Sequence, residues 1–533
     1  MKTTITLLIT LLLAANLPAQ NTFELVKDIN SSGNAYPKNA TIYNGKLYFY
    51  AYDGTNGDEL WTTDGTTAGT VLVKDINPAG NSYPVGGNHP DFAELNGKLY
   101  FNAYDNISES ELWVTDGTAA GTIMVKDINP TGNSYASLFT PYNGKLYFTA
   151  NNGINGDEIW KTDGTTAGTI MFKDINPTGN SIPANFTEYN GKLYFSADNG
   201  TNGYELWESD GFGANTTMLK DINPAGDSDP SQFTEYNDKL YFSADNGTNG
   251  EELWTTDGTL AGTVMVKDIN PGTFSGFPSD FKEYNGKLYF SGTEFANNSE
   301  LWVTDGTTAG TVMVKDINTG TDGGNPSGFT EYNGKLYFSA KDNANGYELW
   351  ATDGTTVGTL LVMDINPGAA NGSPYFFTKY NGKLYFRAKD LINEKQLWVT
   401  DGTTAGTEMI LPTIAPNTNP LNDTVEFVEY DGSLYFGANY DSNGSELWKL
   451  TTEPLSVEDL IINSFILYPN PVKDVLNINA TQPTTLQLYN IQGQLLQEIE
   501  TGENTQVDIS KLASGVYIIK DMNSGAGRKL IKK

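Results

Sequence analysis

Aspartate, asparagine and glutamate side chains recur together in short glycine-containing segments along this chain. The candidate ligand residues in these segments are Asp53, Asn56, Asp58, Glu59, Asp198, Asn202, Glu205, Asp245, Asn249, Glu251, Asp342 and Asn345. Oxygen ligands in flexible loops suit Ca²⁺, which takes about 6 to 8 of them. Asp and Asn before Gly equally favour tight turns, because their side chains bond to nearby backbone amides. We prefer the turn interpretation, and calcium binding stays an open alternative.

Two other patterns could support catalysis. His89 is the only histidine, so a Ser/His/Asp triad could be built only around it, and sites that need several histidines are excluded. It lies in an insertion, where a solvated loop residue is a simpler interpretation than an acid/base role. Paired carboxylates could cleave glycosidic bonds, since Asp and Glu are abundant. A carbohydrate-active enzyme is therefore an alternative to a binding module.

The composition narrows the classes of partner. Sixty-four acidic residues against 32 basic ones give a net charge of -32, which disfavours nucleic acid and anionic membrane surfaces. Such a protein attracts cations or neutral ligands instead. The chain has no cysteine, so disulfides, thiolate metal sites and cysteine nucleophiles are excluded. No cofactor other than calcium is suggested by these residues.

The polar segments belong to a repeat that is marked by tryptophan. The nine tryptophans of the chain are Trp61, Trp113, Trp160, Trp207, Trp254, Trp302, Trp350, Trp398 and Trp448. They are 52, 47, 47, 47, 48, 48, 48 and 50 residues apart, which is typical of a repeat architecture. These rings could stack on sugars, but packing between units is the preferred interpretation, because aromatic side chains bury large areas.

Each repeat unit is predicted to contain four short strands. In the fourth unit the expected strands are 186–189, 192–197, 204–209 and 216–222. An Asn-Gly pair between the first two favours a tight hairpin, since both turn residues need positive φ. Four strands in a unit of this length is the pattern of a propeller blade. We therefore expect an all-β fold with a β-propeller of about nine four-stranded blades.

The two ends of the repeat predict a closed ring. Residues 23–30 match a fourth strand with no first three strands before it, and the ninth unit lacks its own fourth strand. We expect the N-terminal strand to complete the last blade, which leaves no exposed sheet edges. An open solenoid is the alternative, because propellers typically have about 4 to 8 blades. The tight turns would then share one rim, and the longer loops with the acidic residues would share the other.

The repeated motif resembles a known family of exported bacterial proteins. Glu59-Leu60-Trp61 followed by Asp64-Gly65-Thr66 is a full copy of the motif for which the ELWxxDGT repeat is named. The resemblance covers about residues 23–450, with local departures such as Gln396 for Glu. It implies a repeat fold and export, and it carries no activity over to this chain.

The composition changes after residue 452, where the tryptophan repeat ends. The motif residues that we single out beyond it are Tyr468, Pro469, Asn470, Pro471, Gly515 and Tyr517. In this order they resemble the type A C-terminal sorting domain of the type IX secretion system. That resemblance implies a small β-sandwich, the type IX machinery as a partner, and a location outside or on the surface of a Gram-negative bacterium.

The N-terminus is typical of a signal peptide, with Lys2, an apolar run over 5–15 and a cleavage zone near Ala19. The expected domains are a signal peptide (1–19), the repeat propeller (20–452), a linker (453–464) and the sorting domain (465–533). No transmembrane segment is expected in the mature chain. We expect an exported binding or adhesion module with a glycan or matrix ligand. A carbohydrate-active enzyme and a structural surface component are the alternatives.

Overall fold

A computed structural model describes most of the chain. The described residues are 20–82, 92–294, 299–320, 322–412, 417, 419–421, 426–453, 465–480, 483–490, 494–502, 504–521 and 527–533. His89 lies outside them, as do residues 1–19 and 454–464. The chain divides into two compact units, one of them Phe23–Thr451 and the other containing Thr452–Lys533.

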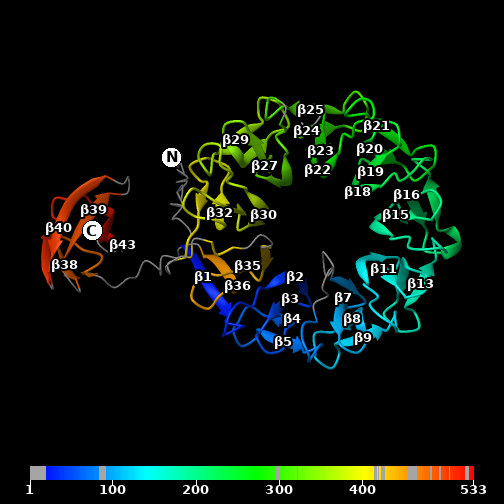
Figure 1. The fold of residues 1–533 in the computed structure, drawn as a ribbon. Helices are drawn as coiled ribbons and strands as arrows, with labels where there is room; N and C mark the ends of the chain where they lie inside the picture. The colour runs from blue at the N-terminus through cyan, green and yellow to red at the C-terminus, as the bar shows by residue number, and fades with distance from the viewer. Residues whose placement is uncertain are drawn as a thin grey trace, which may run out of the picture. The chain divides into compact units, whose positions relative to one another are not determined.

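The first unit consists of four-stranded antiparallel sheets (Figure 1). The first four sheets contain β2 (Lys38–Tyr43), β3 (Lys46–Tyr52), β4 (Asp58–Thr63) and β5 (Val71–Lys74); β6 (Ala93–Leu95), β7 (Lys98–Asp105), β8 (Glu109–Thr115) and β9 (Ile123–Lys126); β10 (Ser137–Tyr142), β11 (Lys145–Asn151), β12 (Asp157–Thr162) and β13 (Ile170–Lys173); β14 (Ala184–Tyr189), β15 (Lys192–Asp198), β16 (Tyr204–Ser209) and β17 (Thr217–Lys220).

The next four sheets repeat the same strand order. They contain β18 (Ser231–Tyr236), β19 (Lys239–Asp245), β20 (Glu251–Thr256) and β21 (Val264–Lys267); β22 (Ser279–Tyr284), β23 (Lys287–Thr293), β24 (Ser299–Thr304) and β25 (Val312–Lys315); β26 (Ser327–Tyr332), β27 (Lys335–Asp342), β28 (Gly346–Thr352) and β29 (Leu360–Met363); β30 (Tyr375–Tyr380), β31 (Lys383–Ala388), β32 (Gln396–Thr400) and β33 (Glu408–Met409). Helix in the described part of the chain is limited to the 3₁₀ turn η1 (Gly213–Asn215). The prediction of an all-β fold made of repeated four-stranded sheets is confirmed.

The hairpin between the first two strands of a sheet forms as its Asn-Gly pair predicts. In the fourth sheet Tyr189 pairs with Lys192, and the two turn residues Asn190 and Gly191 have φ of 47° and 73°. Asparagine tolerates this left-handed region and glycine adopts it at no steric cost, so the pair closes a two-residue turn. The first strand of each sheet lies on the side that faces the common centre, and the fourth lies outside (Figure 1).

The repeated tryptophan packs between neighbouring sheets, as the sequence predicted. Trp207 of β16 is 6% exposed and shares one core cluster with Tyr147 and Ile159 of the preceding sheet. A lysine of the preceding fourth strand approaches the ring of the tryptophan in several units. Lys74 Nζ lies 5.7 Å from the ring centroid of Trp113 and donates a hydrogen bond to Thr122 O at 2.7 Å. The tryptophan surface is therefore part of the interface between sheets.

The last sheet is built from both ends of the repeat. Its strand order is β1 (Gln20–Lys27), β36 (Glu446–Glu453), β35 (Ser433–Ala438) and β34 (Val428–Tyr430). Val26 of β1 shares a core cluster with Trp61 of the first sheet and with Leu447 of β36. On the tight-turn side, Tyr430 Oη donates to Gly45 O at 2.7 Å. The same contact links Tyr284 to Gly334 in neighbouring internal sheets, at 2.6 Å.

The C-terminal unit contains two sheets around one core. One has the order β37 (Phe465–Tyr468), β38 (Val475–Ala480) and β41 (Thr505–Asp508), and the other has β40 (Leu495–Thr501), β39 (Thr484–Asn490), β42 (Gly515–Asp521) and β43 (Gly527–Lys532). Leu476 of β38, Leu488 of β39 and Ile519 of β42 are buried in a single cluster. None of the helices in the described residues has the length and apolarity that crossing a membrane requires.

Candidate functional site

The structure places the acidic candidates of the first and seventh units in loop turns. Asp53 Oδ1 accepts hydrogen bonds from the backbone N–H of Thr55 and Asn56, and Asn56 Nδ2 donates to Asp53 Oδ2 at 2.6 Å. Asp342 and Asn345 make the same contacts in the loop after β27. These side chains stabilise the loop by bonding to its own backbone.

In the fourth and fifth units the equivalent side chains connect the loop to the fourth strand. Asp198 and Asp245 each accept a bond from a glycine N–H two residues later, at 2.7 Å. Asn202 Nδ2 donates to Asp221 Oδ2 at 2.7 Å, and Asn249 Nδ2 donates to Asp268 Oδ2 at 2.8 Å. Of the remaining candidates, Asp58 is paired with Lys38 at 3.4 Å, where the partly exposed charges add little stability.

The three candidate glutamates divide into two kinds. Glu59 and Glu205 are fully buried, and their carboxylates accept backbone hydrogen bonds from the end of the fourth strand, such as Ile76 N to Glu59 Oε2 at 2.9 Å. Burial raises the pKa of each to about 7. Glu251 is the residue before the equivalent buried Glu252, and its Oε1 accepts from Ser243 Oγ at 2.6 Å. Burial also raises the pKa of Glu251.

The predicted ligand residues are spread over several loops. Among the residues that the structure describes, no three or more His, Cys, Asp or Glu side chains are grouped so that they could hold a metal ion. The bonds of these side chains to their own loops support the turn interpretation, and calcium binding stays a prediction.

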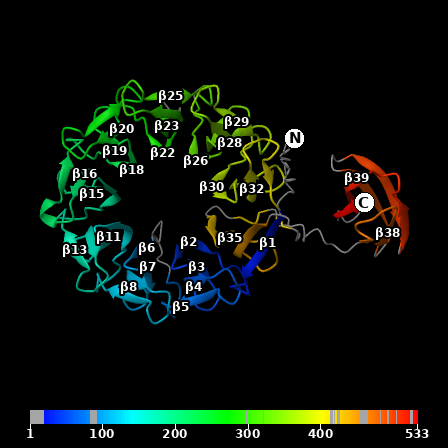
Figure 2. The same cartoon turned by 180° about the vertical axis from the view of Figure 1, so that it is seen from behind.

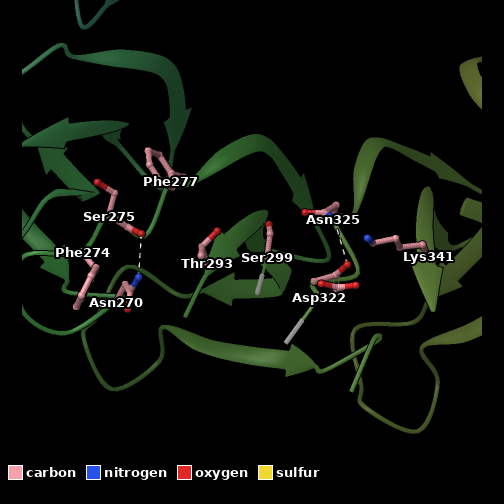
Figure 3. Close-up of a pocket in the computed structure, with 10 residues that line it drawn as sticks. Asn270, Phe274, Ser275, Phe277, Thr293, Ser299, Asp322, Asn325 and Lys341 are labelled. Carbon is pink, nitrogen blue, oxygen red and sulfur yellow. Dashed lines mark hydrogen bonds between the residues drawn. The ribbon is translucent and has the colours of Figure 1, made fainter. Parts of the chain in front are cut away.

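A cleft of about 530 Å³ opens on the long-loop side of three consecutive sheets (Figure 3). We call it the loop cleft, and its lining residues are Asn270, Phe274, Ser275, Phe277, Thr293, Ser299, Asp322, Gly323, Asn325 and Lys341. The volume lies within the range of about 300 to 1,000 Å³ that small-molecule sites occupy. The lining residues come from the loops after β21 and β25 and from the ends of β23, β24 and β27.

Longer loops open the loop cleft. In the fourth unit Asn223 Nδ2 donates to a carbonyl four residues later, whereas Asn270 and Asn318 reach carbonyls five residues later. The extra residue accounts for the change in tryptophan spacing from 47 to 48 at these units. Sequence reasoning missed the loop cleft, and this change of spacing is the signal that could have found it.

Backbone hydrogen bonds hold the walls of the loop cleft. Phe277 N donates to Glu251 O at 3.2 Å, and Thr293 N of the next sheet donates to Gly276 O at 2.7 Å. The following loop repeats both bonds, from Asn325 N to Ser299 O at 2.8 Å and from Lys341 N to Gly324 O at 2.9 Å. Each loop is therefore bonded both to its own sheet and to the next one, which gives the site a preformed scaffold.

The residue at the position of Phe277 and Asn325, whose backbone N–H donates to the third strand of its own sheet, differs from unit to unit. The residues with left-handed φ at this position, between 40° and 49°, are Tyr36, Tyr135, Ile182, Asp229, Phe277, Asn325 and Ser373. Such a backbone costs on the order of 1 to 3 kcal/mol for a residue other than glycine. In the loop cleft the position supplies one exposed aromatic ring, Phe277, and one amide, Asn325. Phe277 is 55% exposed and Phe274 is 65% exposed.

The C-terminal motif residues join opposite ends of their domain. Asn470 Nδ2 donates to Lys529 O at 2.6 Å, and Ile531 N donates to Asn470 Oδ1 at 2.9 Å. Tyr517 is buried, and its hydroxyl donates to Ala513 O at 2.8 Å. Asn470 therefore connects the opening segment of the domain to the terminal strand β43.

Comparison with known families assigns this C-terminal unit. Residues 466–533 match the model of the secretion system C-terminal sorting domain. The tail is a type IX sorting domain. It indicates that the protein is secreted by the type IX machinery to the outside or the surface of the cell, as the motif residues predicted. No curated protein matches the sequence.

Several solved structures with a distant likeness are hydrolases and peptidases. A puromycin hydrolase is 13% identical with a TM-score of 0.35, and the alignment covers 70% of this chain and 60% of that chain. One of two prolyl endopeptidases is 11% identical with a TM-score of 0.37, and the alignment covers 66% of this chain and 54% of the endopeptidase. A Mycobacterium tuberculosis puromycin-hydrolyzing peptidase is 10% identical, with a TM-score of 0.35 and coverage of 72% and 61%. The chain spans about 60% of such proteins, and likeness at this level carries no argument about activity.

Proposed function

We propose that the repeat region is a closed nine-bladed propeller of the ELWxxDGT type that acts outside the cell as a binding module for neutral glycans. The observation that carries the proposal is the loop cleft, where the exposed rings of Phe274 and Phe277 lie beside amide, hydroxyl and charged groups. Sugar rings have apolar faces that pack on aromatic rings and hydroxyls that need such polar partners. A net charge of -32 disfavours acidic glycans.

The contacts between the first and last sheets support the closed ring. Lys27 Nζ of β1 donates to Thr70 O at 2.8 Å, as Lys74 does to Thr122 O between the first and second sheets. We further propose a signal peptide over 1–19, the repeat region over 20–452, a linker over 453–464 and the sorting domain from residue 465. We also propose that the acidic loops bind calcium. Binding assays of the repeat region with and without a calcium chelator test this proposal.

A retention assay tests the glycan proposal. The purified repeat region is incubated with cellulose, chitin, β-1,3-glucan and mannan, and both retained protein and released sugars are measured. We expect retention of the wild type on at least one polymer, and a loss of affinity of about tenfold or more in the double variant F274A/F277A. A tenfold loss corresponds to about 1.4 kcal/mol, which is within the range of one lost aromatic contact.

The matched control is F212A. Phe212 is 67% exposed but follows the tight turn after β16, on the side away from the long loops. Since all three rings are exposed, we expect the variants to melt like the wild type. Equal retention of F274A/F277A and wild type would refute the loop cleft as the binding site, and release of sugars would establish an enzyme instead.

A further inference from the structure

A second hollow lies where three inner strands begin. It has a volume of about 300 Å³ and lies between β22, β26 and β30, and we call it the inner hollow. Figure 2 shows these strands as neighbours on the side of their sheets that faces the common centre. The residues that matter for its chemistry are Asp280 of β22, Gly328 and Thr330 of β26, and Tyr375 and Phe376 of β30.

A glycine at a repeated bulge creates the inner hollow. The register of each of these three strands shifts near its start, and the bulge residues Asp280, Gly328 and Phe376 have φ of 55°, 72° and 58°. Asn39 and Asn185 occupy the same position in other units, with φ of 54° and 59°. The absence of a side chain at Gly328 therefore leaves space between Asp280 on one side and Phe376 on the other.

The walls of the inner hollow combine an aromatic surface with hydrogen-bonding oxygens. Tyr375 is 45% exposed, and its ring lies 5.1 Å from that of Phe376 in an edge-to-face arrangement. Asp280 lines the inner hollow beside Gly328, and burial raises the pKa of its carboxyl, while the nearby Gly328 N–H lowers it. A carboxylate can accept about four hydrogen bonds, so it can also accept from ligand hydroxyls. This pairing of a ring with acceptors suits a pyranose.

The inner hollow and the loop cleft share two chain segments. Phe277 lines the loop cleft three residues before Asp280, and Asn325 lines it three residues before Gly328. Three residues span at most about 11 Å. We propose that the inner hollow is a second subsite for the same extended neutral glycan that the loop cleft binds. The inference rests on the proposed function, because it assumes a glycan in the loop cleft.

The test fills the inner hollow with a side chain that the chain already uses there. G328N places asparagine at a φ that Asn39 and Asn185 adopt, and a Cβ at this position meets no atom closer than 3.4 Å. The matched control is G334N, in the Asn-Gly turn of the same sheet, where a Cβ meets nothing within 4 Å. Asp238 already occupies the equivalent turn position with φ of 55°. Both variants should therefore fold.

Binding is measured by calorimetry with the disaccharide and the hexasaccharide of β-1,4-glucan, β-1,3-glucan and β-1,4-mannan. We expect G328N to bind the hexasaccharide at least tenfold more weakly than the wild type and to bind the disaccharide unchanged. G334N should behave as the wild type with both. Y375A, which removes the exposed ring without filling the inner hollow, should show the same selective loss as G328N.

The outcomes separate the two proposals. If the wild type binds the hexasaccharide and both G328N and Y375A bind it equally well, the inner hollow is not a subsite, while the loop cleft proposal stands. If G328N weakens the disaccharide as much as the hexasaccharide, the two sites do not share one extended ligand, and the inference is overturned. If the wild type binds no oligosaccharide, the proposed function fails and the inference fails with it.

Discussion

A buried glutamate recurs in the third strand of the repeat. The fully buried members of this set are Glu59, Glu111, Glu158, Glu205, Glu252, Glu300, Glu348 and Glu446. Two of them, Glu59 and Glu205, are among the predicted ligand residues, but they hold the end of the fourth strand through backbone N–H groups. Glu252 accepts from Ile269 N at 2.6 Å and from Asn270 N at 3.4 Å. Because these backbone groups are buried and need partners, Glu252 stabilises the start of the loop that leads into the loop cleft.

These glutamates make stability depend on pH. Burial raises the pKa of Glu252 and of Glu348 to about 8, from the ordinary 4.5. A raised pKa in the folded state means that the folded protein binds more protons than the unfolded chain between these values. The stability that Glu252 contributes is therefore fully present below about pH 4.5 and is lost as the pH rises through about 8. We expect the melting temperature of the repeat region to fall between pH 5 and pH 8.5.

The variant E252Q isolates one such group. Glutamine does not titrate, and its amide nitrogen cannot accept a backbone N–H, so we expect a loss of about 1 to 3 kcal/mol at pH 5. The difference from the wild type should shrink by pH 8.5, because only the wild type loses stability there. Denaturant unfolding at both pH values measures it, with E188Q, at an exposed glutamate, as control. A difference that is constant with pH would contradict the assignment.

At the scale of elements, one added loop residue turns a structural repeat into a candidate site. The loops after β21 and β25 keep the backbone bonds of the other units, yet the additional residue between the asparagine and the bonded carbonyl enlarges the space in front of them. Loops tolerate such insertions without loss of the sheets that they connect. We therefore expect the scaffold to determine stability and the variable loops to determine the proposed recognition.

Deleting Thr273 tests this separation. The deletion restores the length of the fourth-unit loop, in which Asn223 Nδ2 reaches a carbonyl four residues later. Thr273 is exposed, so we expect the melting temperature to change by less than a few degrees, while glycan affinity falls by tenfold or more. Melting curves and the retention assay measure both quantities. Unchanged retention would show that the extra residue does not shape the site.

At the scale of the whole repeat region, the N-terminal strand β1 completes the last four-stranded sheet. β1 lies in the same sheet as β36, and Val26 is 1% exposed in a cluster that includes residues of the first and last sheets. We propose that the ring closes in this way, with β1 as an edge strand of the last sheet that packs against the first sheet. A closed ring should then unfold as one cooperative unit, whereas an open array would lose its last sheet first.

V26D tests closure. An unpaired charge in this cluster should lower the free energy of unfolding by about 3 kcal/mol or more, through desolvation of the carboxylate. We expect one shifted transition, seen alike by circular dichroism and by tryptophan fluorescence. V357D is the control, because Val357 is 86% exposed. Two separate transitions in V26D, with the main one unshifted, would indicate an open arrangement.

The sequence by itself determined the all-β repeat of four-stranded sheets and the sorting tail. Asn190-Gly191 closes its hairpin through local backbone preferences, and the tail motif is contiguous in the chain, so both are visible without a structure. The buried position of Trp207 also followed, because a tryptophan at one position of every unit is typical of packing between units.

Only the tertiary structure decided which polar residues are available to a ligand. Glu59 and Asp198 are both acidic residues shortly before a repeated tryptophan, yet one is fully buried on backbone N–H groups and the other stabilises a loop. The loop cleft and the inner hollow combine side chains from successive units about 48 residues apart. Distances between such side chains depend on how sheets pack and on the conformation of single residues such as Gly328, which no local pattern in the chain encodes.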